Sequence, residues 1–136
     1  MNRDDDSLLR NLKRVTRGLT FMSESDYPVE PFLQDGAGQP APTAQDFVAS
    51  KKTDANAGVS EVDFDNFFKG ATQEQDGQDS EARTQAARFQ SLVRLLRDNL
   101  SDIHVYRVGD VEADVYVTGR TKSGSLAGVT TKVVET

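Results

Sequence analysis

The chain has 136 residues, and its 16 basic against 22 acidic side chains give a formal charge of −6 at pH 7. That length fits one domain with its own core, and the absence of cysteine excludes disulfides, cysteine-bound zinc and thiol catalysis. The sequence has no apolar run long enough for a transmembrane helix, its start lacks the order of a signal peptide, and its acidity disfavours direct nucleic-acid binding. We therefore expect a single cytoplasmic domain over residues 1–136, monomeric when free.

The N-terminal segment carries a helical pattern of apolar residues. They recur at spacings of 4, 3 and 4, which predicts a helix over residues 7–20. Asp6 or Ser7 can accept hydrogen bonds from its first free backbone N–H groups as a cap. Gly18 lies where we expect this helix to end.

Residues 21–28 are expected to form an ordered loop that leads into a short strand over 29–33. Phe21 and Tyr27 are apolar anchors at the two ends of this loop. Between them lies a polar stretch that includes Glu24 and that we expect to be exposed.

The middle of the chain alternates polar loops with short elements, because glycine, proline and polar clusters interrupt its apolar residues. The expected order is turns over 34–43, a short helix over 44–50 capped by Thr43, a polar loop over 51–58, a strand over 59–62, a helical turn with aromatic anchors over 63–68 and a second polar loop over 70–80.

The C-terminal half gives the strongest signals. Apolar residues recur at helical spacing throughout residues 81–100, which predicts a long helix that forms one wall of the core. Three strands are expected to follow, and strict alternation in the second places four residues on one face. This order, helices first and an antiparallel meander last, indicates an α+β fold. The strands are 104–108, 111–118 and 126–135, and the four residues are Val111, Ala113, Val115 and Val117.

Catalytic residues are not evident. His104 would need a nucleophile and an orienting acid to act as a base, and a single histidine that opens a strand is typical of a structural role. Glu112 and Asp114 share a strand face and could do acid–base chemistry, with a solvated polar face as the alternative. We therefore predict that the protein is not an enzyme.

Metal and phosphate motifs are also missing. The loop over 76–81 and the pair Asp63 and Asp65 supply oxygen ligands but lack the spacing of a calcium-binding EF-hand. No glycine-rich phosphate loop is present. We therefore expect neither a metal nor a cofactor of its own.

Acidic loops offer a different chemistry. One contains Glu24 and another Asp76, and the last predicted strand reaches the chain end, which would place the terminal carboxylate at a defined position. A solvated surface explains either loop alone. Together, several anionic groups on rigid segments could enter a basic, metal-containing cleft and take the positions of phosphates.

Three segments resemble the cyanobacterial nuclease A inhibitor family. They are residues 21–28 (FMSESDYP), 105–117 (VYRVGDVEADVYV) and 126–136 (LAGVTTKVVET). The resemblance implies an α-β-α sandwich with a mainly antiparallel sheet, similar to plant pathogenesis-related proteins. It also implies one-to-one binding to a sugar-nonspecific ββα-metal endonuclease, with Glu24 pointing towards the hydrated metal of the nuclease and the C-terminal Thr136 reaching its catalytic site.

The sequence departs from this family at one predicted contact. The family pattern places a tryptophan after the aspartate of the loop before the long helix, whereas here Gly77 follows Asp76 and the chain has no tryptophan. Tryptophan is frequently an interface anchor. A non-inhibitory interaction module on the same fold is therefore the alternative function.

Overall fold

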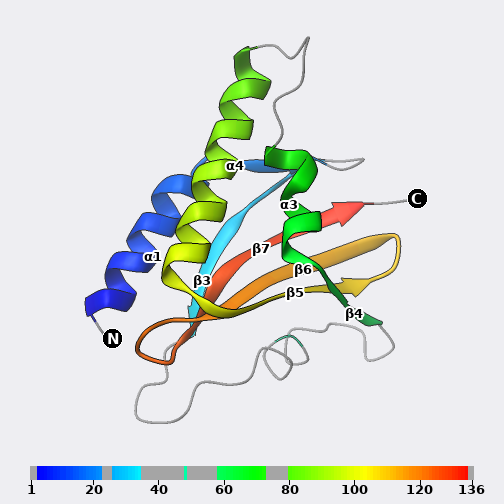
Figure 1. Cartoon of the computed structure of the whole chain (residues 1–136). Helices are drawn as coiled ribbons and strands as arrows, with labels where there is room; N and C mark the ends of the chain where they lie inside the picture. The colour runs from blue at the N-terminus through cyan, green and yellow to red at the C-terminus, as the bar shows by residue number, and fades with distance from the viewer. Residues whose placement is uncertain (1–2, 23–25, 35–47, 49–57, 73–79, 135–136) are drawn as a thin grey trace.

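The computed structural model describes residues 3–22, 26–34, 48, 58–72 and 80–134. Its centre is a five-stranded antiparallel sheet in the order β3-β7-β6-β5-β4 (Figure 1). The predicted C-terminal meander is confirmed, because β5, β6 and β7 are consecutive neighbours. The strands are β3 (Glu30–Gln34), β4 (Val59–Val62), β5 (Ser101–Gly109), β6 (Glu112–Arg120) and β7 (Leu126–Val134).

Three helices among the described residues pack on one face of this sheet (Figure 1). The long helix expected over 81–100 is confirmed to within one residue at each end. The predicted aromatic turn at 63–68 is part of a longer helix, which continues to Thr72. The helices are α1 (Arg3–Thr16), α3 (Phe64–Thr72) and α4 (Ser80–Asn99).

The first helix starts and ends earlier than the sequence predicts. It begins at Arg3, so the expected cap at Asp6 or Ser7 is wrong, because both residues lie inside the helix. It ends at Thr16 because Gly18 adopts a left-handed backbone with φ of 71°. The apolar repeat misled the assignment, since its last member is buried just beyond the helix.

The segment expected to be an ordered loop is largely a hairpin. Strand β1 (Thr20–Met22) pairs antiparallel with β2 (Asp26–Pro28), with Thr20 opposite Pro28 and Met22 opposite Asp26. Three-residue strands are too short to show the alternation by which a strand is predicted from sequence. The next strand, expected over 29–33, is confirmed as β3.

The main core lies between the helices and the facing side of the sheet. Ala113, Val115 and Val117 are buried there as the alternation predicts. The prediction for Val111 is wrong. Its side chain is 49% exposed, because β6 begins only at Glu112 and Val111 lies in the preceding turn.

The opposite face of the sheet carries a second, smaller cluster of buried apolar side chains. Val48, a helical residue that is 1% exposed, packs with Tyr106, Val108 and Leu126. The expected α+β class with helices packed on an antiparallel sheet is confirmed. The remainder of the helix expected over 44–50 lies outside the described residues, as do nearly all of the loops predicted over 34–43, 51–58 and 70–80. Among the described helices, none is long and apolar enough to cross a bilayer.

Candidate functional site

All four predicted contact residues, Glu24, Asp76, Gly77 and Thr136, lie outside the described residues. The structure does describe the chain on one or both sides of each. The positions of these flanking segments limit where the four residues can lie.

The hairpin that contains position 24 is anchored to the helical layer. Phe21 on β1 stacks on Phe67 of α3, with ring centroids 4.7 Å apart, and meets Phe89 of α4 edge-on at 6.0 Å. Such aromatic pairs stabilise beyond the area that they bury. The predicted anchoring role of Phe21 is therefore confirmed, and the hairpin has a fixed position on the fold.

The strand that leads to position 136 is held to its end. Val133 is 3% exposed in the main core, and Val134 pairs with Glu112 at the end of the β6–β7 ladder. The strand predicted over 126–135 is thus confirmed as far as Val134, two residues before the last residue.

The hairpin and this strand meet side by side. Thr131 donates a hydrogen bond from Oγ1 to the carbonyl of Pro28 at 3.0 Å, and Lys132 places Nζ 5.7 Å from the ring centroid of Tyr27. Pro28 lies beside Thr131 and Tyr27 beside Lys132, so β2 and β7 run in opposite directions here. The Met22–Asp26 pair therefore lies towards the same end of the sheet as Val134. We call this end of the sheet the hairpin end.

Lys132 also links this junction to the neighbouring strand. Its ammonium lies 3.0 Å from Glu112 Oε1 and 4.0 Å from Asp114 Oδ1 on β6. The hydrogen bond to Glu112, with the negative charges of Glu112 and Asp114, raises the pKa of Lys132 above its ordinary value. The pair predicted as a possible acid–base site is therefore neutralised in part by a lysine, which fits the solvated-face alternative.

The segment that contains Asp76 and Gly77 runs between Thr72, the end of α3, and Ser80, the start of α4. Gln90 of α4 donates from Nε2 to the Thr72 carbonyl at 2.8 Å, so the exit from α3 is fixed against the side of α4. The described contacts do not join Ser80 to the hairpin end.

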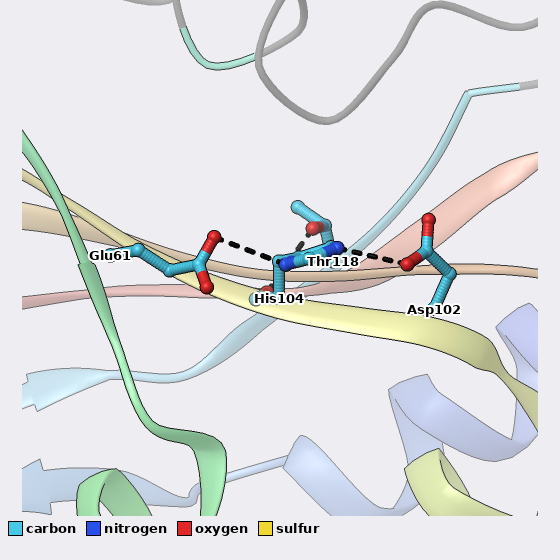
Figure 2. A network of polar contacts seen from close by, with 4 residues as sticks. All are labelled: Glu61, Asp102, His104 and Thr118. Carbon is cyan, nitrogen blue, oxygen red and sulfur yellow. Dashed lines mark hydrogen bonds and ion pairs between the residues drawn. The ribbon is translucent and has the colours of Figure 1, made fainter.

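His104 has two carboxylate partners, which the sequence did not reveal. Its Nδ1 lies 3.1 Å from Glu61 of β4 and its Nε2 lies 2.9 Å from Asp102 (Figure 2). Thr118 donates from Oγ1 to the His104 carbonyl at 3.1 Å. The contact with Glu61 joins β5 to β4. Within the described part of the chain no hydroxyl group bonds to the ring, so the site is not a serine–histidine pair.

The remaining acidic candidates have structural partners. Asp63 accepts a hydrogen bond from the Asn66 backbone N–H at 3.1 Å and caps α3. Asp65 pairs with Arg97 of α4. The described ranges contain no group of three histidine, aspartate or glutamate side chains that could hold a metal ion.

One buried carboxylate was missed by sequence reasoning. Asp5 of α1 is 1% exposed and accepts hydrogen bonds from Ser123 Oγ at 2.7 and 2.8 Å and from Ser125 Oγ at 2.6 Å. Burial alone would raise the pKa of this carboxyl, but hydrogen bonds from Ser125, Ser123 and Thr121 outweigh it and hold the pKa below its ordinary value. The available signal was helical spacing, since Asp5 shares a face with Leu8.

Comparison with known families places the chain by sequence. The model of a family described as nuclease A inhibitor-like protein matches residues 6–136. That range includes the hairpin, α3, α4 and every strand of the sheet. A search of curated proteins finds no match.

Proposed function

The chain belongs to the nuclease A inhibitor-like family, and we propose that it binds a sugar-nonspecific endonuclease of the ββα-metal type one to one and blocks its active site. In this proposal, the blocking groups are the carboxylates of Glu24 and of the C-terminal Thr136. The structural observation that supports it most is the junction of β2 with β7, which puts the flanks of both residues at the hairpin end.

Chain connectivity limits how far each group can lie from this end. Glu24 is two residues from both Met22 and Asp26, and Thr136 is two residues from Val134. Since consecutive Cα atoms are about 3.8 Å apart, each Cα lies within about 7.6 Å of a described strand end. Both carboxylates can therefore approach one site from adjacent positions.

Carboxylates suit the active site of a metal-dependent nuclease. Such a site holds phosphate oxygens beside a divalent cation, and carboxylate oxygens are hard ligands that bind the same cation or its waters. A carboxylate has no phosphodiester bond, so the bound enzyme cannot cleave it. The formal charge of −6 favours encounter with a basic cleft and makes the association rate fall with added salt.

The proposal is tested by titrating a ββα-metal endonuclease with the wild type, Glu24→Ala and a form extended by several residues beyond Thr136. We expect the wild type to inhibit digestion. Each altered protein should inhibit with a constant about 30-fold higher, which corresponds to about 2 kcal/mol for an interface hot spot.

A matched control removes one negative charge elsewhere. Asp6 is exposed on α1, near the end of the sheet opposite the hairpin end. Asp6→Ala changes the net charge as Glu24→Ala does, so it should leave the inhibition constant within about twofold of wild type. Absence of inhibition by micromolar wild type contradicts the function. Equal potency of all four proteins contradicts the assigned contacts.

A second candidate function is an interaction module that does not inhibit a nuclease. It is supported by Gly77, which stands where the family pattern has a tryptophan anchor. Affinity capture from host extract distinguishes the two candidates. Recovery of a ββα-metal nuclease supports inhibition, whereas recovery of another protein without any nuclease supports the module.

A further inference from the structure

The turn between β5 and β6 lies at the hairpin end and exposes an apolar side chain. Glu112, the residue after this turn, pairs with Val134 at the end of β7. Val111 within the turn is 49% exposed. An isolated exposed valine is ordinary on a protein surface. Val111 is of interest because it lies next to the end of β7, two residues before Thr136.

The backbone of this turn is fixed before any partner binds. Arg107 donates from Nη2 to the Asp110 carbonyl at 2.7 Å. Gly109 has φ of 116°, and a Cβ at that position would lie 2.6 Å from the Glu112 carbonyl oxygen, so the close approach requires glycine. A preorganised turn loses little conformational entropy when it enters an interface.

The charges around Val111 indicate the kind of surface that it fits. Glu112 is paired with Lys132. The side chain of Asp110 is exposed, and its carboxylate makes no hydrogen bond or ion pair with the part of the chain that the structure describes. The tip of the turn therefore presents an apolar side chain next to an exposed carboxylate.

We propose that the β5–β6 turn is a further contact region for the nuclease, with Val111 as an apolar anchor and Asp110 opposite a basic group at the rim of the active-site cleft. This inference rests on the proposed function, because the partner is the same enzyme. It adds a contact that does not depend on metal coordination, and so it assigns part of the affinity to the rim of the cleft.

The chain supplies a close control in Val59. Its side chain is 46% exposed, nearly as much as that of Val111, but it belongs to the edge strand β4. Strand β4 is three strands from β7 in the sheet order, which is about 14 Å at the usual strand spacing. Val59 pairs with Val108, so it lies at the same end of the sheet and differs from Val111 only in its distance from β7. A contact centred on the end of β7 should include Val111 and leave Val59 in solvent.

The first experiment compares inhibition constants for Val111→Ser, Val59→Ser and Asp110→Asn. We expect Val111→Ser to weaken inhibition about tenfold and Val59→Ser to change it less than about twofold. Asp110→Asn should slow association several-fold at low salt and have little effect at high salt, since rim charges act mainly on encounter. Both valines are exposed, so neither substitution should change the thermal unfolding midpoint.

The second experiment uses the absence of cysteine, which makes any introduced thiol unique. Val111→Cys and Val59→Cys are each labelled with a thiol-reactive benzophenone and irradiated with the purified nuclease. We expect covalent capture of the nuclease by the label at position 111 and not by the label at position 59.

The outcomes separate the two proposals. If the wild type inhibits but Val111→Ser is as potent as wild type, or if both valine variants lose potency equally, the turn contact is wrong and the proposed function stands. If the wild type does not inhibit, the proposed function fails and the turn contact fails with it.

Discussion

The two ends of the sheet satisfy their carboxylates in opposite ways. Where β6 turns into β7, Asp5 is 1% exposed and accepts hydrogen bonds from Ser123 and Ser125. At the hairpin end, Glu112 and Asp114 both lie close to the partly exposed Lys132. Asp110 is exposed and makes no ion pair within the described part of the chain. A carboxylate already bonded to protein donors gains little from a partner, whereas an exposed one can exchange water for a cation. Folding stability and partner binding should therefore be separable in this molecule.

The largest expected effect is on stability. Asp5→Ala should lower the free energy of unfolding by about 3 kcal/mol, because it removes charge-assisted hydrogen bonds and leaves the buried Ser125 hydroxyl without its acceptor. Urea denaturation measures this change. The neighbouring Asp6→Ala should stay within about 0.5 kcal/mol, and equal effects of the two substitutions would contradict the assigned role of Asp5.

Acid should remove part of the same stabilisation. The lowered pKa of Asp5 means that its contribution is complete above the pKa of an unfolded aspartate, about 3.9, and is lost as pH falls through the folded pKa. Urea denaturation between pH 5 and the acid limit should show this loss in wild type. In Asp5→Asn the dependence should be weaker, and an identical pH profile of the two proteins would contradict the role of this carboxylate.

A smaller effect is expected for the junction at the hairpin end. Lys132→Met removes the link between Tyr27 and β6 while it keeps most of the side-chain stem. We expect faster amide exchange in β1 and β2 of the free protein, and a rise of about fivefold in inhibition constant, or about 1 kcal/mol.

Lys122 provides the matched control for this change. It is an exposed lysine in the β6–β7 turn, so Lys122→Met removes the same charge far from the hairpin. Unchanged exchange in the hairpin of Lys132→Met, or the same rise in inhibition constant for both lysine variants, would show that Lys132 does not position the hairpin.

The smallest effect is expected at His104. Its two carboxylate contacts are partly exposed, and such ion pairs contribute about 0–1 kcal/mol. His104→Gln should therefore lower the free energy of unfolding by less than about 1 kcal/mol and leave the inhibition constant unchanged. A large loss of inhibition with normal stability would place the histidine in the interface.

The fold was predicted where apolar residues repeat over many positions. Helix α4 and the three C-terminal strands each contain enough turns or alternations to reveal their period. The C-terminal end of α1 was misplaced because its apolar repeat continues past the left-handed Gly18. The hairpin was missed because its pairing depends on contacts with α3, α4 and β7 that lie far away in the sequence.

The site residues could be predicted only from the resemblance to the family. Positions 24, 76, 77 and 136 show no periodic pattern or metal-ligand spacing, and acidic loops are common on protein surfaces. The partners of Asp5 and His104 were not evident for a related reason. Ser123 and Ser125 are more than 110 residues from Asp5 in the chain, so only the folded structure brings them together.

The proposed inhibition requires that Glu24 and the chain terminus act together in one site. A double-mutant cycle tests it most directly, with inhibition constants for the wild type, Glu24→Ala, the C-terminal extension and the two combined. We predict that the combined loss differs from the sum of the single losses by at least about 0.5 kcal/mol, because groups in one pocket are coupled. Single losses that simply add, or that are absent, would contradict a shared site.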